Sequence, residues 1–153
     1  MHRRIIPDVI DGQQVLSCFD AHTTVADVAD VMRERNIGAV LVMDGRRLTG
    51  IVTERDLVTK VVAKGLVPAE VVLDVVMTRD PDTIAPGEHA LDALRKMRVG
   101  NYRHLPVVDS DGVLHGMVSI RDLYAVVTDE LSEDLTAVET MIYGESYGSG
   151  GRS

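Results

Sequence analysis

Apolar residues recur at helical spacing in two matching stretches of the chain. In each stretch they occupy positions i, i+3, i+4 and i+7, which predicts a helix with one apolar face. Thr24 directly precedes the first stretch and is a candidate N-cap. The apolar positions are Val25, Val28, Ala29 and Met32 in the first stretch, and Ala90, Ala93, Leu94 and Met97 in the second.

Two short runs with strand character follow each predicted helix. The runs flank a turn sequence, Asp44-Gly45 or Asp111-Gly112, and this combination is typical of β-hairpins. A second helix is expected after the first hairpin, with Leu57, Val58, Val61 and Val62 on one face, and a short strand is expected before each unit, near 16–18 and 83–84. The four hairpin runs cover 39–43, 48–53, 105–108 and 114–119.

The chain contains an internal repeat of about 65 residues. A shift of 65 positions places residues 25–44 over 90–109 with six identities. After one residue inserted near Ser110, a shift of 66 places 48–57 over 114–123 with six more. We therefore divide the chain into a first repeat, a second repeat, an amphipathic helix containing Leu131, Leu135, Val138 and Ile142, and a Gly/Ser-rich tail expected to be disordered. These four segments cover 7–66, 67–130, 131–143 and 144–153.

Composition and charge narrow the functional classes. Hydrophobic residues make up 45% of the 153 positions and aromatic residues 3%, so the core must be built from aliphatic side chains and Met. The net charge of −8 argues against nucleic-acid binding. No apolar run approaches the roughly 20 residues of a membrane span, and no apolar segment follows Arg3 and Arg4 as in a secretory signal. Cys18 is alone, which excludes an internal disulfide, and a cytoplasmic location is expected.

Two patterns that could indicate catalysis or a metal site lack the necessary context. Residues 144–148 match G-x-S-x-G, but no strand precedes them, and no Asp and His follow to complete a triad. The five His residues form no i, i+4 pair and have no Cys partner, so we expect no metal site. The protein is therefore expected not to be an enzyme.

Two further segments carry a family resemblance. Residues 50–56 and 116–122 resemble the G-h-h-[ST]-x-x-D signature of CBS domains, named for cystathionine β-synthase, and residues 105–109 resemble the strand that precedes it. The resemblance covers about residues 7–142. It implies an α/β (α+β) fold in which two pseudo-symmetric β-α-β-β-α repeats form one intertwined CBS-pair module with a cleft. It also implies a homodimer of modules and an adenosine-containing ligand such as AMP, ADP, ATP or NAD.

The residue types of this signature suit a nucleotide. An Asp at the position of Asp56 can accept hydrogen bonds from a ribose diol, and Thr53 stands at a strand-to-helix junction, where free N–H groups face a phosphate. Arg55 adds positive charge, and Gly50 permits close backbone approach. The alternative is that Asp56 only caps the helix and that Arg55 is an exposed helix charge. The equivalent residues of the second repeat are Ser119, Arg121, Asp122 and Gly116.

The resemblance also implies that the two sites are unequal. In the family, basic residues of one repeat reach the phosphate held near the other repeat's Asp. Applied to this chain, the Thr53–Asp56 site gains Arg103 and His104, whereas the Ser119–Asp122 site faces the uncharged Gly38 and Ala39. The first site is therefore expected to bind more tightly.

Two hypotheses of different classes remain. The first is a regulatory sensor that binds an adenine nucleotide, and the second is a structural dimerisation module without a regulatory ligand. The Thr or Ser and the Asp present in both repeats favour the first hypothesis, because packing alone does not require them. The sequence names no regulated protein. A homodimer is expected under either hypothesis, because both second helices carry broad apolar faces: Leu57, Val58, Val61 and Val62, and Leu123, Tyr124, Val126 and Val127.

Overall fold

A computed structural model describes residues 2–149 of the chain. It shows which residues begin and end the first helix of each repeat. Thr24 caps α1 (Val25–Arg35), because its side chain accepts a hydrogen bond from the Asp27 amide at 3.2 Å. Asn36 ends α1 in the left-handed conformation with φ 52°, and Asn101 ends α4 (Ala90–Gly100) with φ 55°. Asn tolerates this conformation better than most residues, which explains why it recurs in both repeats.

Each repeat contains the predicted hairpin. Strand β2 (Ala39–Asp44) pairs antiparallel with β3 (Arg47–Thr53), and β5 (His104–Val108) pairs with β6 (Leu114–Ser119). The turn glycines have positive φ, 59° at Gly45 and 81° at Gly112. Strand β1 (Cys18–Phe19), the short strand expected near 16–18, runs parallel to β2. The strand expected near 83–84 is reduced to a single parallel bridge from Ile84 to Val107.

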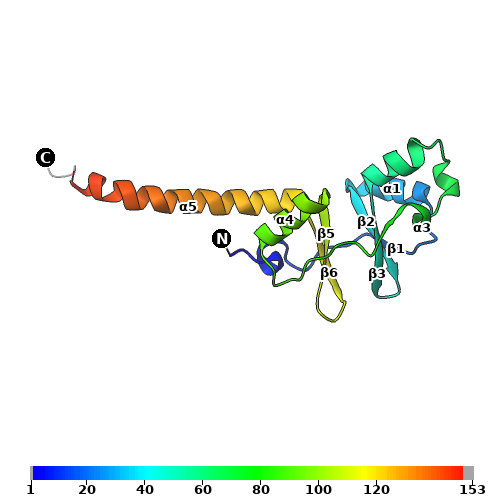
Figure 1. Ribbon diagram of the computed structural model, residues 1–153, viewed down its shortest axis with the longest axis horizontal. Helices are drawn as coiled ribbons and strands as arrows, with labels where there is room; N and C mark the ends of the chain where they lie inside the picture. The colour runs from blue at the N-terminus through cyan, green and yellow to red at the C-terminus, as the bar shows by residue number, and fades with distance from the viewer. Residues whose placement is uncertain (1, 150–153) are drawn as a thin grey trace.

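The segments after the hairpins differ between the repeats. Helix α2 (Glu54–Leu57) continues into the wider turn η2 (Val58–Val62). The chain then passes through η3 (Pro68–Glu70), α3 (Leu73–Val76) and the short strand β4 (Thr78–Arg79). After the second hairpin, one helix, α5 (Ile120–Ser149), extends well beyond the rest of the chain (Figure 1).

Helix α5 corrects two expectations. A break was expected at 130/131, but α5 is continuous there, because no Gly or Pro lies between 120 and 143. The tail expected from 144 onward is helical over 144–149, and 150–153 lie outside the described residues.

Part of the apolar face proposed for dimerisation is internal, because Val61 and Leu123 are fully buried, whereas Val58, Val62 and Tyr124 are exposed.

The two halves complete each other's hydrophobic cores. Residues 71–77, which follow the first repeat in sequence, pack among Val25, Val28 and Val52 of the first half. Strand β4 then adds to the edge of β3. In the opposite direction, the N-terminal turn η1 (Ile5–Val9) packs into the second half, where Ile5 is fully buried and its amide donates to the Glu88 carbonyl at 2.8 Å. This exchange confirms the expected intertwined module, and the boundary at 66/67 in sequence is not a boundary in space.

The signature glycines make room for these exchanged segments. A Cβ atom at Gly50 would lie 2.5 Å from Met77 Sδ, and one at Gly116 would lie 2.6 Å from Ile10 Cδ1. Both distances are shorter than any ordinary carbon contact, so a side chain at either position would push against a segment from the other half. The role expected for these glycines, close approach to a ligand, is therefore corrected to close approach of the exchanged segments.

A third apolar cluster joins the hairpins of the two halves, which stand side by side in Figure 1. Ala39, Leu41 and Ile51 of the first hairpin are buried against Leu114 and Met117 of the second. This cluster therefore contains side chains from both hairpins. None of the helices in the described part of the chain is long and apolar enough to cross a membrane.

Candidate functional site

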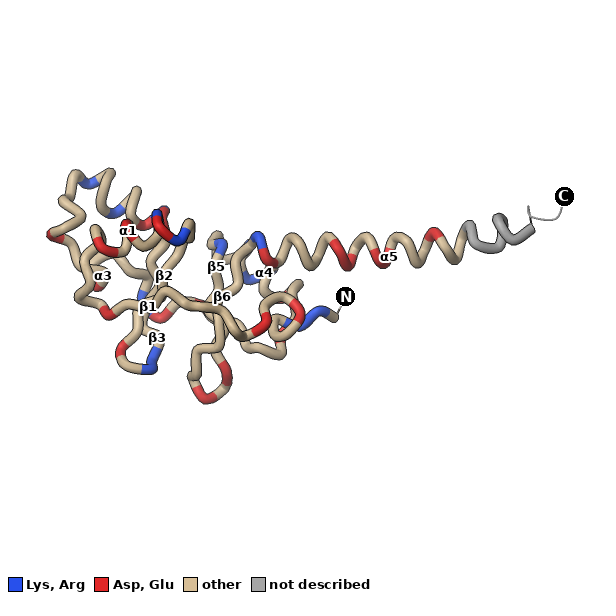
Figure 2. The backbone as a smooth tube through the Cα atoms, turned by 180° about the vertical axis from the view of Figure 1, so that it is seen from behind, with Lys and Arg blue, Asp and Glu red and all other residues tan. Residues whose placement is uncertain are grey.

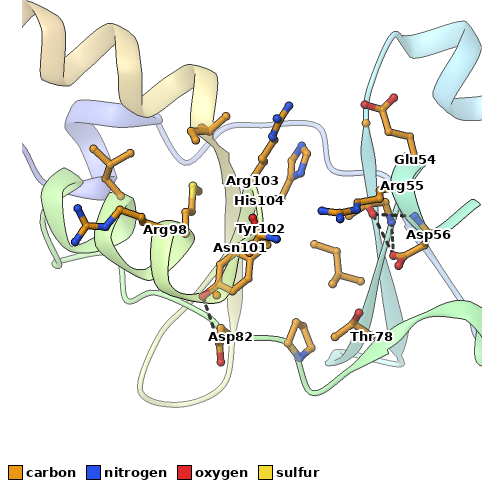
Figure 3. Close-up of a pocket in the computed structure, with 18 of the residues that line it drawn as sticks. Glu54, Arg55, Asp56, Thr78, Asp82, Arg98, Asn101, Tyr102, Arg103 and His104 are labelled. Atoms are coloured by element: carbon orange, nitrogen blue, oxygen red, sulfur yellow. Dashed lines mark hydrogen bonds between the residues drawn. The ribbon is translucent and has the colours of Figure 1, made fainter. Parts of the chain in front are cut away.

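An open cleft of about 1040 Å³ lies between the two halves (Figure 3). One wall is the junction of β3 and α2, residues 53–56, together with Gly38. The opposite wall runs from the end of α4 to the start of β5, residues 97–104, and includes Ile120 and Tyr124 of α5. The linker residues 78–82 form the base. The cleft is thus built from both repeats.

The cleft brings together five of the eight residues expected to bind a ligand. Its lining includes Thr53, Arg55, Asp56, Arg103 and His104. The equivalent residues of the second repeat, Ser119, Arg121 and Asp122, are outside this lining. The structure therefore places the first signature opposite the basic pair of the second repeat.

Thr53 and Asp56 form a capping box at the start of α2. The backbone N–H and the hydroxyl of Thr53 donate to Asp56 Oδ2 at 2.9 and 3.1 Å, and the Asp56 amide donates back to Thr53 Oγ1 at 3.3 Å. Ser119 and Asp122 repeat this arrangement at 2.9, 3.0 and 3.3 Å. The capping alternative raised by the sequence is thus realised in both repeats. In each box the second oxygen, Oδ1, takes no part in the cap.

Arg55 and Arg103 line the cleft from opposite halves, and both side chains are exposed. In Figure 3 the side chain of Arg55 extends from the first half toward Arg103 and His104. Within the described part of the chain, neither Arg55 nor Arg103 is among the residues that form ion pairs. Two guanidinium groups left without a carboxylate at the same opening provide donors for an anion.

His104 is less basic than a free imidazole. Burial lowers its pKa from 6.5, the nearby Glu54 and Asp122 carboxylates raise it, and Arg103 lowers it. At neutral pH, Arg103 is therefore the main source of positive charge in the pair. His104 pairs with Ser119 in the hairpin register, and the Ile120 amide donates to the Arg103 carbonyl at 2.8 Å. The basic pair therefore lies between the two signatures and is not confined to the first one.

The sequence interpretation missed several residues of the cleft. Glu54 faces the basic pair, and the position equivalent to it in the second repeat is Ile120. Tyr102 donates to Asp82 Oδ2 at 2.8 Å, and burial together with this bond raises the pKa of Tyr102 to about 12. These residues lie outside the repeated identities, so the comparison of the repeats gave no signal for them. Lys60, which lies outside the lining, was also missed, and its Nζ lies 3.1 Å from Asp56 Oδ1.

Two other patterns from the sequence remain apart from the cleft. Among the described residues, no group of three or more His, Cys, Asp or Glu side chains could hold a metal ion. The G-x-S-x-G stretch at 144–148 lies in the last turns of α5, and its side chains fall outside the described part of the chain.

Comparison with known proteins identifies the relatives of this chain. The family model of the CBS domain matches residues 2–63 and 72–129. The CBS domain-containing protein CBSCBSPB2 of Arabidopsis thaliana is 37% identical over 131 residues, which cover 84% of this chain and 24% of that protein. The chain thus spans about a quarter of the length of this curated relative.

Two solved structures resemble about three quarters of the chain. One, a CBS-domain protein of Burkholderia ambifaria assigned to signal transduction, has 34% identity and a TM-score of 0.71, covering 77% of this chain and 86% of that chain. The other, the CBS domain protein PAE2072 of Pyrobaculum aerophilum in complex with AMP, has 25% identity and a TM-score of 0.69, covering 78% and 94%. The intertwined arrangement of the two halves is therefore one that experimental structures also contain.

Proposed function

The chain belongs to the CBS domain family, and from this premise we propose that its cleft binds an adenosine-containing ligand as a regulatory signal, without turnover. The observation that carries the proposal is the meeting of Thr53 and Asp56 with two arginines that form no ion pairs in the described part of the chain, across one cleft of about 1040 Å³. The complex of the Pyrobaculum aerophilum protein with AMP supports this choice of ligand class. AMP, ADP, ATP and NAD all remain candidates.

The chemistry of the cleft suits the three parts of such a ligand. Ile51, Pro81 and the ring of Tyr102 offer apolar surface for a purine base. Asp56 is a charged acceptor for ribose hydroxyls, and hydrogen bonds to charged groups are stronger than neutral ones. Arg103, with Arg55 opposite, can bind a phosphate through paired N–H donors. Base, ribose and phosphate would thus contact both halves of the protein.

We expect binding without turnover because hydroxyl groups of the cleft already donate hydrogen bonds within the protein. The Thr53 hydroxyl donates to Asp56 Oδ2, and this oxygen also accepts the Thr53 backbone N–H, so both groups are engaged in the helix cap. The Tyr102 hydroxyl is likewise bonded to Asp82. In the described lining of the cleft we therefore find no assembled nucleophile and base.

Calorimetry with adenosine, AMP, ADP, ATP and NAD tests the proposal on wild type, Asp56→Asn and Asp122→Asn. Asparagine keeps an oxygen for the cap but loses the charge that strengthens bonds to a diol. We expect Asp56→Asn to weaken the tighter binding event by about tenfold or more, from a charge-assisted hydrogen bond of about 1.5–3 kcal/mol. Asp122→Asn is the matched control and should leave that event nearly intact. Absence of heat with all five ligands would refute the proposal and favour the structural alternative.

A separate observation supports self-association. Leu131, Leu135, Val138 and Ile142 form a stripe along α5, and each of these side chains is about half exposed or more, from 49% at Val138 to 60% at Leu135. Exposed apolar stripes of this kind mark association surfaces, and two-fold pairing is the commonest arrangement. We therefore propose a homodimer in which α5 contributes contact surface.

A further inference from the structure

The two repeats differ at the position one helical turn after the signature Asp. In the first repeat this position is Lys60, and in the second it is Val126. Lys60 Nζ lies 3.1 Å from Asp56 Oδ1, the oxygen that the capping box does not use. Val126 instead packs partly against the second hydrophobic core. The substitution changes a charged contact at the ligand site into an apolar core contact.

Lys60 is also held in place from the other side. Its Nζ donates to the Val76 carbonyl at 2.8 Å, in the exchanged segment that completes the first core. The Asp56 side chain is only 14% exposed, and the Lys60 side chain is 37% exposed. The ammonium group therefore bridges the Asp56 carboxylate and a fixed backbone carbonyl.

The hydrogen bonds of Asp56 leave little acceptor capacity for a ligand. Oδ2 accepts two hydrogen bonds from Thr53, and Oδ1 is in contact with Lys60. In the second repeat, the side-chain hydrogen bonds that Asp122 accepts within the described residues all reach Oδ2. A ribose diol that approaches Asp56 must share Oδ1 with Lys60 or displace it, and Asp122 has no comparable competitor on its own helix.

We propose that Lys60, which lies outside the lining of the cleft and contacts Asp56, determines ligand specificity: it competes with ribose hydroxyls for Asp56 Oδ1 and lowers the affinity for the diol. This inference rests on the proposed function. It differs from the roles of Arg55 and Arg103, because Lys60 acts on the sugar and not on the phosphate. In the first repeat, Lys60 thus competes with the sugar for Asp56, and the Val76 carbonyl holds Lys60 in position.

The test compares adenosine with 2′,3′-dideoxyadenosine, which has the same base but no diol. Binding of both to full-length wild type, Lys60→Met and Lys64→Met is measured by calorimetry, with displacement titration for the weaker ligand. Methionine keeps the aliphatic stem and removes the ammonium group, and Lys64 is an exposed lysine near the end of the same helical segment. Thermal melting of each variant verifies that it is folded.

We expect Lys60→Met to bind adenosine about two- to fivefold more tightly, which is the upper part of the range measured for exposed ion pairs. The affinity for dideoxyadenosine should stay at the wild-type value, and Lys64→Met should change neither. Equal changes for the two nucleosides, or unchanged or weaker adenosine binding in Lys60→Met, would overturn the inference while leaving the proposed function intact. If no variant binds any nucleoside or nucleotide, the proposed function itself fails.

Discussion

Replacing Gly50 with alanine tests whether this glycine is needed for close packing of the exchanged segment that contains Met77. The added Cβ would lie 2.5 Å from Met77 Sδ, 3.0 Å from Met77 Cγ and 3.1 Å from the Thr78 carbonyl oxygen. Met77 is 8% exposed and belongs to the first core, so its side chain has little room to move away. The carbonyl belongs to the backbone of β4, which is paired with β3 at this point.

The size of the effect follows from two opposing terms. Overpacking of a core costs about 1–3 kcal/mol, whereas replacing glycine restricts the unfolded chain and returns about 0.4–1 kcal/mol. We therefore expect Gly50→Ala to lower the free energy of unfolding by about 1–2 kcal/mol. For a chain of this length the melting temperature should fall by about 2–8 °C.

Urea unfolding measures both the loss of stability in Gly50→Ala and its origin at Met77. It compares four proteins: wild type, Gly50→Ala, Met77→Ala and the double variant. If the Cβ presses on Met77, the double variant should be more stable than the sum of the single effects predicts, by at least about 0.5 kcal/mol. Gly87→Ala is the matched control, because a Cβ there meets nothing within 4 Å. A Gly50→Ala protein as stable as wild type, or strictly additive effects, would refute the role assigned to this glycine.

Two further predictions concern pH and assembly. Burial lowers the pKa of His104 below 6.5, so the folded protein disfavours protonation of this imidazole. The stability that comes from burying neutral His104 is therefore present above about pH 6.5 and is lost as the pH falls through the lower pKa of the folded state. Between about pH 7 and 5, the free energy of unfolding in urea should therefore fall more steeply for wild type than for His104→Gln, and parallel curves would contradict this. Leu135→Glu places a charge on the exposed stripe of α5 and should shift the protein from dimer to monomer in light scattering, whereas Thr136→Glu, one position along, should not. A wild-type protein that is already monomeric at micromolar concentration would count against the homodimer.

Local signals in the sequence were sufficient for most elements of the fold. The Thr24 cap, the hairpin turns and the apolar stripes each depend on a few neighbouring residues, and the structure confirms them. The break expected at 130/131 was wrong, because no Gly or Pro there interrupts the helix. The exchange of segments was inferred only from the family resemblance. The apolar pattern of residues 71–77 shows that they are buried but not in which half.

The candidate site was predictable to the extent that it reuses the repeated residues. Matching the repeats found Thr53 and Asp56, the family resemblance implied that Arg103 lies opposite them, and the lining of the cleft includes all three. Glu54 and Tyr102 could not be found in this way, because the repeats differ at those positions. The sequence could not reveal the contact of Lys60 with Asp56 either, because an i, i+4 spacing permits such a pair without requiring it.

The capping boxes change which residues distinguish a ligand-binding module from a structural one. Thr53 and Asp56 recur as Ser119 and Asp122 at the same spacing, and each pair satisfies N–H groups at the start of a helix. Helix formation alone therefore explains why both pairs are present, so their presence does not by itself favour a ligand. The cap also holds one carboxylate oxygen in a fixed position, which leaves the other oriented in advance for a further contact. Arg103 is different, because no cap requires it and no ion pair within the described residues balances its charge. The cap does not require this guanidinium at the cleft, so Arg103 supports the proposed nucleotide more than the capping residues do.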